Sequence, residues 1–167
     1  MPFGTTGSTS TVSVVFQGQP SAAVSMNVTT VSPAIFTANS SGTGPAAAIN
    51  IPAGTVNDAG HPAKAGDVVT LFFTGGGPTN PPQADGKPQG DGSPGNPILL
   101  AVLPVTVTIG GKSATVQFAG GAPGVVAGIM QVNFVVPSGL TAGPVPVVVQ
   151  VSGTPSQNGV TVFASGT

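Results

Sequence analysis

The segment Val105-Thr106-Val107-Thr108-Ile109-Gly110-Gly111 decides the fold class of this chain. Apolar and polar residues alternate strictly from Val105 to Ile109, which is the pattern of a β-strand with one face in a core and one face in water. The pair Gly110-Gly111 follows at once and is typical of a two-residue turn between antiparallel strands. The segment therefore predicts a β-hairpin whose Val and Ile side chains enter a core.

The same pattern recurs along the rest of the chain. Val, Thr and Phe occur in short runs separated by Gly and Pro, whereas strong helix formers are scarce. These runs predict strands at residues 11–17, 23–29, 46–50, 67–74, 105–109, 112–119, 128–136, 145–152 and 159–164. We therefore expect an all-β chain, with turns at the Gly- and Pro-rich segments between the strands.

The composition shows that the chain can fold, although it is rich in residues that interrupt regular structure. The 167 residues include 26 Gly and 18 Pro, a share that also occurs in disordered chains. Val, Ile, Leu and Phe together contribute 44 residues, which is above the roughly 20% below which a chain cannot bury a core. Cysteine is absent, so disulfides, zinc–thiolate sites and cysteine nucleophiles are excluded.

Few residues carry a charge, and this scarcity excludes several classes of partner. The chain has three Lys, no Arg and four Asp as its acidic residues. Binding to nucleic acid or to an anionic membrane requires a clustered basic face, which three scattered lysines cannot form. The most apolar run, residues 98–109, is interrupted by Pro104 and is shorter than the roughly 20 residues of a membrane-spanning helix. We expect neither a nucleic-acid partner nor a membrane span.

The polar residues indicate where the protein acts. Most of them are Ser, Thr, Asn and Gln, a composition more usual for exported bacterial surface proteins than for cytosolic enzymes. The start of the chain, Met1-Pro2-Phe3-Gly4, lacks the basic and apolar regions of a secretory signal. The chain as given is therefore either cytosolic or a mature or excised piece, and we expect an excised piece of an extracellular or cell-surface protein.

Two segments of the chain resemble each other at a displacement of 135 residues. Residues 2–21 and 137–156 share Pro, Gly, Thr, two Val, Gly, Pro and Ser at matching positions. Because the later segment supplies the last hairpin of a domain, the earlier one is predicted to be the last hairpin of a preceding domain. We therefore divide the chain into an N-terminal hairpin over residues 1–31 and a main domain over residues 32–167.

A lone hairpin of this kind cannot bury its own apolar face. We therefore expect residues 1–31 to pack on the main domain, to exchange with a neighbouring chain, or to extend the sheet of another subunit. The last two outcomes would join subunits into an assembly.

Three blocks of sequence between residues 32 and 165 carry a resemblance to a known family. They are Ser32-Pro33-Ala34-Ile35-Phe36-Thr37 with residues 42–50, Asn57 with residues 61–71 and 74–78, and residues 105–111 with 118–120, 122–124 and 131–137. These blocks are similar to the uncharacterised C-terminal domains that are abundant in secreted acidobacterial proteins of the Solibacter type. More loosely, the order of strands is similar to that of Ig-like domains of the IPT/TIG kind. The resemblance implies an Ig-like β-sandwich in exported, often multidomain proteins, and it supplies no catalytic residues.

Residues 75–97 predict a long exposed loop, because they are rich in Pro and Gly and contain almost no apolar residue. Within this loop, Asp85 and Asp91 are two carboxylates in a Gly-rich setting, and calcium accepts oxygen ligands of this kind. The alternating Asp residues and the closing Glu of a calcium loop are missing, so a flexible loop is the simpler interpretation. Asp85 and Asp91 are thus weak calcium candidates, and we expect no other cofactor.

His61 is the single histidine and raises the question of catalysis. A Ser-His-Asp triad is one arrangement, and a small secreted hydrolase or carbohydrate-active protein using Asp85, Asp91 and His61 is another. Against both, no Ser lies in a Gly-x-Ser-x-Gly turn, and the two Asp lie on a loop that lacks preorganisation. The chain also lacks the Trp and Tyr that usually form sugar-binding platforms, so nothing supports a carbohydrate ligand.

These observations favour a structural function over a catalytic one. We expect an Ig-like β-sandwich with an additional N-terminal β-hairpin, acting as a non-catalytic structural, adhesion or assembly module. Its partner would be another protein or a second copy of the chain, bound through the hairpin over residues 1–31. The hydrolase that uses Asp85, Asp91 and His61 is the alternative.

Overall fold

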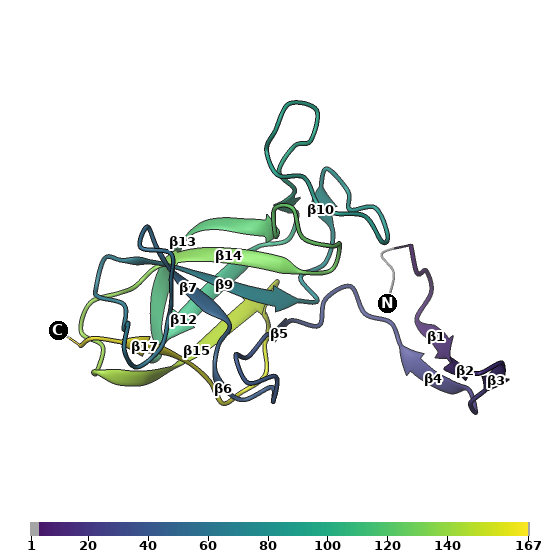
Figure 1. The fold of residues 1–167 in the computed structure, drawn as a ribbon, viewed down its shortest axis with the longest axis horizontal. Helices are drawn as coiled ribbons and strands as arrows, with labels where there is room; N and C mark the ends of the chain where they lie inside the picture. The colour runs from purple at the N-terminus through teal and green to yellow at the C-terminus, as the bar shows by residue number, and fades with distance from the viewer. Residues whose placement is uncertain (1–3, 167) are drawn as a thin grey trace.

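The computed structural model describes residues 4–166, and these residues form an all-β structure without a helix. Figure 1 shows two parts: a rounded body at the left and a thin N-terminal extension that projects from it at the right. We call residues 4–31 the arm and residues 32–166 the body.

The body contains thirteen strands, which form one sheet. They are β5 (Ala34–Ile35), β6 (Gly44–Pro45), β7 (Ala48–Ile51), β8 (Thr55–Val56), β9 (Val68–Thr74), β10 (Thr79–Asn80), β11 (Leu100–Ala101), β12 (Val105–Ile109), β13 (Lys112–Gly121), β14 (Met130–Val135), β15 (Gly143–Val151), β16 (Thr154–Pro155) and β17 (Val160–Ala164). The main path of the sheet runs β6-β17-β15-β12-β13-β14-β9-β7-β8. The hairpin predicted around Gly110-Gly111 is therefore confirmed as β12 and β13.

Two long strands allow this sheet to curl. The first part of β13 pairs with β12 and the rest with β14, with a register shift between Val116 and Phe118. Similarly, the first part of β15 pairs with β17 and the rest with β12. Because each strand passes from one neighbour to another, the two halves of the sheet bend toward each other and enclose one core.

The core follows from the alternation of side chains along these strands. On β9, Val69, Leu71 and Phe73 are fully buried, whereas Phe72 is only half-buried. Strand β14 buries every second residue in the same way, from Met130 to Phe134. The opposite half of the sheet contributes the inward residues of β12, β15 and β17, which belong to the same cluster. The core is thus mainly aliphatic, as the Val-rich runs predict, with Phe73 and Phe134 as its fully buried aromatic side chains.

The arm forms a separate hairpin. Strands β1 (Thr9–Val12) and β4 (Val24–Asn27) pair with each other, and β2 (Val15–Phe16) pairs with β3 (Gln19–Pro20) at its tip. Neither pair joins the sheet of the body.

Each predicted strand overlaps an observed one, although the first is divided into β1 and β2. The strands that the sequence pattern missed are all two residues long: β3, β5, β6, β8, β10, β11 and β16. Segments of this length contain too few residues to show an alternation.

The loop predicted at residues 75–97 is less free than its composition suggests. Gln89 is 2% exposed, and its side-chain amide donates to the backbone oxygens of Val126 and Ile129. Thr79 is also buried, within the short strand β10. The prediction of an unanchored loop was therefore wrong in one respect, because a buried polar side chain replaces the missing apolar anchor.

Candidate functional site

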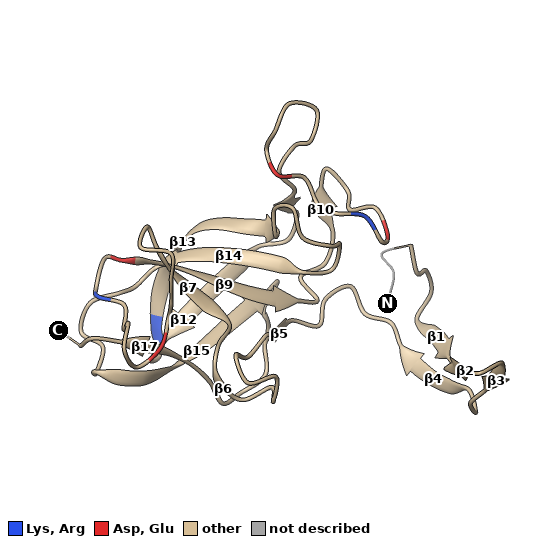
Figure 2. Cartoon of the chain, viewed as in Figure 1, with Lys and Arg blue, Asp and Glu red and all other residues tan. Residues whose placement is uncertain are grey.

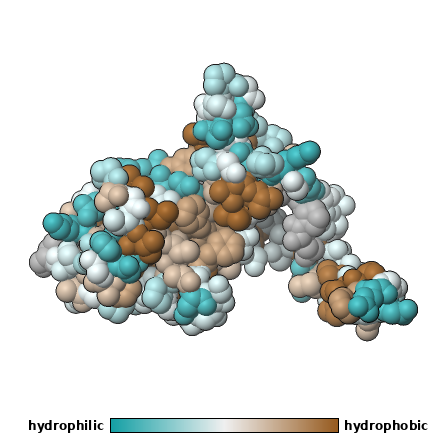
Figure 3. All heavy atoms as spheres, viewed as in Figure 1, coloured by the Kyte–Doolittle hydropathy of each residue, from teal (hydrophilic) through white to brown (hydrophobic). Residues whose placement is uncertain are grey.

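The arm presents a set of exposed apolar side chains, which is the main candidate for a functional surface. Phe16 is 73% exposed, and the other members are Val12, Val14, Val15, Val24 and Met26. Figure 3 shows this set as a brown patch near the end of the arm, away from the body. Because soluble proteins seldom leave such side chains together in water, this set is a candidate surface for contact with another molecule.

The arm has the same pairing as the hairpin that closes the body, which confirms the internal similarity predicted from the sequence. We call β15 to β17, residues 143–164, the closing hairpin. Ser10 lies opposite Met26 in the arm, and the matching Val145 lies opposite Val162 in the closing hairpin. At the tips, Val15 lies opposite Pro20, as Gln150 lies opposite Pro155.

The turns of the two hairpins also match. Gln17 and Gly18 have φ of 49° and 79°, and Ser152 and Gly153 have φ of 50° and 83°. Two consecutive residues with positive φ form the tight turn that suits the twist of antiparallel strands. Gly at the second position adopts this conformation without a side-chain penalty.

A serine fixes the same contact beyond each turn. Ser21 N donates to Val14 O over 2.8 Å, and Ser21 Oγ accepts from Val14 N over 3.0 Å. Ser156 makes both contacts with Val149, over 2.8 Å and 3.2 Å. The arm is therefore a preformed copy of the closing hairpin.

The two hairpins differ in what covers their apolar faces. In the closing hairpin, the inward residues are all 3% exposed or less: Val145, Val147, Val149, Val151, Val160, Val162 and Ala164. In the arm, the matching positions include Val12, Val14, Phe16, Val24 and Met26, all of which are exposed. The arm thus displays the type of face that the body buries when the closing hairpin provides it.

The arm contacts the body at its root, where Val31 packs against the core. Gly4 N of the arm donates to Asp85 Oδ2 over 3.1 Å, and Ser32 N, at the first residue of the body, donates to Gly75 O over 2.9 Å. A groove of about 720 Å³ lies between the arm and the body, lined by residues that include Met26, Thr30, Gly76 and Met130. Only one end of the arm is held, so its apolar tip stays clear of the body (Figure 1).

Asp58 and His61 form a local pair in the loop that precedes β9. Asp58 Oδ1 accepts from Gly60 N, His61 N and His61 Nδ1, over 2.9, 2.8 and 3.1 Å. The hydrogen bond from the His61 side chain is the main reason why the pKa of Asp58 lies below its ordinary value, and the backbone donors act in the same direction. Both side chains are exposed at the surface, where the pair stabilises a turn.

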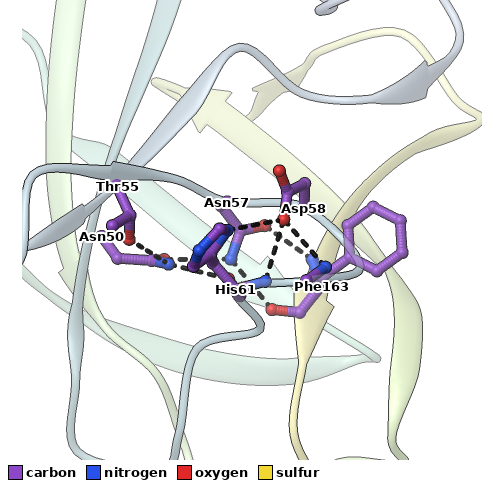
Figure 4. A network of polar contacts seen from close by, with 7 residues as sticks. Asn50, Thr55, Asn57, Asp58, His61 and Phe163 are labelled. Carbon is purple, nitrogen blue, oxygen red and sulfur yellow. Dashed lines mark hydrogen bonds and ion pairs between the residues drawn. The ribbon is translucent and has the colours of Figure 1, made fainter.

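Next to this turn lies a buried network of amide side chains that the sequence pattern did not predict (Figure 4). Asn57 is 2% exposed; its Nδ2 donates to Phe163 O over 2.9 Å, and its Oδ1 accepts from Phe163 N over 2.7 Å. Asn57 Nδ2 also donates to Asn50 Oδ1, and Asn50 Nδ2 donates to His61 O. The side chain of Asn57 therefore binds β17 as a strand backbone would. In the sequence, Asn57 stands out only as part of the second block that carries the family resemblance, and that resemblance assigns it no role.

The calcium candidates lie in the segment between β10 and β11. Asp91 Oδ1 accepts from Ser93 Oγ, Asn96 Nδ2 and Ser93 N, over 2.6, 2.9 and 3.0 Å. The Ser93 hydroxyl is the main reason why the pKa of Asp91 lies below its ordinary value. Asp85 Oδ2 instead accepts a hydrogen bond from Gly4 N of the arm. Each carboxylate is engaged with a different part of the chain.

The charged residues as a whole lie in two groups, one near β10 and one at the opposite end of the body (Figure 2). Within residues 4–166, no three His, Asp or Glu side chains gather in a way that could hold a metal ion. The same residues contain no helix that could cross a membrane. His61 belongs to the turn before β9, whereas Asp85 and Asp91 belong to the segment before β11.

Comparison of the chain with protein families, with curated proteins and with solved structures finds no match.

Proposed function

We propose that this protein is a non-catalytic structural and assembly module of an exported or cell-surface protein, with the architecture of an Ig-like β-sandwich. In this proposal the body is a rigid spacer, and the arm joins it to another protein. Binding takes place through the apolar face of the arm and through the free edges of its strands. The expected partner is a β-rich protein surface or a second copy of the chain.

The observation that carries this proposal is the exposure of Phe16, Val14 and their neighbours on a hairpin that is otherwise fully formed. A two-stranded hairpin is marginal in water unless a third element covers it. The arm has no charged residue from Gly4 to Val31, so apolar burial and backbone hydrogen bonds would carry the binding. The two halves of the curled sheet, which enclose one hydrophobic core, support the sandwich architecture.

The geometry gives the hydrolase alternative no comparable support. His61 is paired with Asp58 in an exposed turn, and Asp91 is held by Ser93 and Asn96. A general acid and a general base need to flank one bound substrate, whereas these groups belong to separate loops with partners of their own.

The proposal is tested by measuring the solution mass of the full chain by light scattering over a range of concentrations. We expect mass to rise with concentration and the double variant Val14→Ser, Phe16→Ser to remain monomeric. The matched control is Val102→Ser, Val126→Ser, which removes two exposed apolar side chains from the body and should associate as the wild type does. Equal masses for the wild type and the arm variant at all concentrations would overturn the proposal.

A further inference from the structure

We propose that the arm closes a second body of the same fold, joined in tandem, by taking the position that the closing hairpin holds in the first. This inference rests on the proposed function, and it identifies the partner that the arm would bind. The partner is a copy of residues 32–142, which we call the open body, because it includes every strand from β5 to β14 and lacks only the closing hairpin. The position left between β12 and β6 is called the slot.

The register of the closing hairpin shows where each residue of the arm would lie. Along β12, Ile109 lies opposite Val147 and Val107 opposite Val149. The arm places Val12 and Val14 at these two positions, and it places Phe16 where Val151 lies opposite Val105. Each is an apolar residue that would enter an apolar core.

The second strand of the arm fits the other side of the slot. Val160 of β17 pairs in parallel with Gly44 of β6, and Val160 and Val162 are buried. Because the arm has the same cross-strand register, Val24 and Met26 would lie at these two positions. The slot thus offers the arm a strand edge on each side, one from β12 and one from β6.

The chemistry of the two surfaces is compatible. The interface between the closing hairpin and the body is an established interface of this molecule, and the arm repeats one side of it. Neither the arm nor the two strands that flank the slot contain a charged residue, so no charge is buried when they meet. Four inward positions differ: Val145 corresponds to Ser10, Val151 to Phe16, Val162 to Met26 and Ala164 to Val28, so all but Ser10 remain apolar. The arm also has two residues between Ser21 and Val24, where the closing hairpin has three between Ser156 and Val160.

A tandem arrangement is favoured over exchange between two complete chains. In a complete chain the slot is already filled by Val147, Val149 and Val151, which are at most 1% exposed. Exchange would expose those valines in order to bury the arm, so it would gain little apolar burial. An open body has no hairpin to displace. Closing it with the arm therefore buries the apolar face of the arm and the apolar residues that line the slot.

The experiment adds a second open body to the chain. Residues 32–142 are joined directly to residue 8, so that the chain from Ser8 onward is retained and Ser8 follows Ala142 as Gly143 does in the native chain. Thr108→Cys in the added body and Ser13→Cys in the arm should form a disulfide, because Ser13 corresponds to Val148, which lies opposite Thr108. Since the native chain has no cysteine, any disulfide reports this pair.

The matched control tests the register. Thr106→Cys with Ser13→Cys shifts the pair by two residues along the same face, because Thr106 lies opposite Gln150. We expect disulfide formation at least ten-fold faster for the Thr108 pair than for the Thr106 pair, and its loss when Val14 and Phe16 are both changed to Ser. Equal rates for the two pairs would overturn the inference.

A second fusion separates misfolding from failure of the inference. In it, residues 32–166, with their own closing hairpin, precede residues 29–167. If this fusion is protease-resistant in both bodies while the first body of the arm-closed fusion is degraded, the arm does not close it and the inference is wrong. Association of the full chain that depends on Val14 and Phe16, without the Thr108 disulfide, would leave the proposed function in place and overturn this inference alone.

Discussion

Val14 and Val149 occupy the same position in two matching hairpins, yet Val149 is fully buried and Val14 is 66% exposed. Each accepts a hydrogen bond from the backbone of a serine beyond the turn, Ser21 in one case and Ser156 in the other. The local structure is therefore the same, and the difference lies in what covers the apolar face. This relationship connects the fold of the body with the proposed role of the arm.

The first prediction compares these two residues directly. Val149→Ala removes buried methyl groups from the core and should lower the free energy of unfolding of the body by about 2 kcal/mol. Val14→Ala is the matched control and should leave that value unchanged, because Val14 is outside the core. Urea unfolding followed by circular dichroism measures both. Equal losses of stability would show that the arm packs on the body in solution.

The second prediction concerns Asn57. Asn57→Ala removes the side chain that binds the backbone N and O of Phe163, so Phe163 N loses its acceptor and Asn50 Oδ1 loses its donor, while Phe163 O still accepts from Ala63 N. We expect a loss of about 3 kcal/mol in the free energy of unfolding. Asn158→Ala, at an exposed position before β17, is the control and should have no measurable effect. A much smaller loss in the free energy of unfolding for Asn57→Ala would mean that water or another side chain replaces the hydrogen bonds of the amide.

The third prediction concerns the anchor of the long loop. Gln89→Ala removes the hydrogen bonds to Val126 O and Ile129 O, so residues 80–98 should open more often. We expect faster cleavage at Asp85 and Asp91 by a protease specific for aspartate. Gln19→Ala, on the exposed tip of the arm, is the control and should be cleaved at the wild-type rate. An unchanged cleavage rate for Gln89→Ala would show that other contacts hold this loop.

The fourth prediction is the dependence of stability on pH. The pKa values of Asp58 and Asp91 are lower in the folded chain than their ordinary values. A lowered folded-state pKa contributes stability that is present above the unfolded-state pKa and is lost as pH falls through the folded-state pKa. Thermal midpoints should therefore be flat from neutral pH down to about pH 5 and fall only near and below about pH 4. The double variant Asp58→Asn, Asp91→Asn should show a smaller fall at acid pH, and a decline that begins above pH 6 would contradict this account.

The fifth prediction concerns calcium. Asp91 Oδ1 already accepts three hydrogen bonds that close its loop, and Asp85 accepts one from Gly4. We therefore expect the thermal midpoint to be the same in millimolar calcium and in a calcium chelator. A rise with calcium that disappears in Asp91→Asn would establish a site there, because a ligand that binds only the folded state raises its stability.

The fold class and most strands could be predicted because they depend on local patterns. The alternation from Val105 to Ile109 defines a buried face wherever that strand lies, and Gly110-Gly111 defines the turn. The repeat of residues 2–21 at 137–156 could also be read directly, since the residues that shape a hairpin are few and local. By contrast, the anchoring roles of Gln89 and Asn57 depend on partners distant in the sequence, Ile129 and Phe163.

By itself, the sequence determined that the chain is a β-protein with two copies of one hairpin, because turn residues and alternation act over neighbouring positions. Only the tertiary structure decided that one copy is buried and the other exposed. Burial depends on the strands that lie beside each hairpin, and β12 and β6 flank the closing hairpin but not the arm. The same local structure therefore completes a core at one end of the chain and leaves its apolar face exposed at the other.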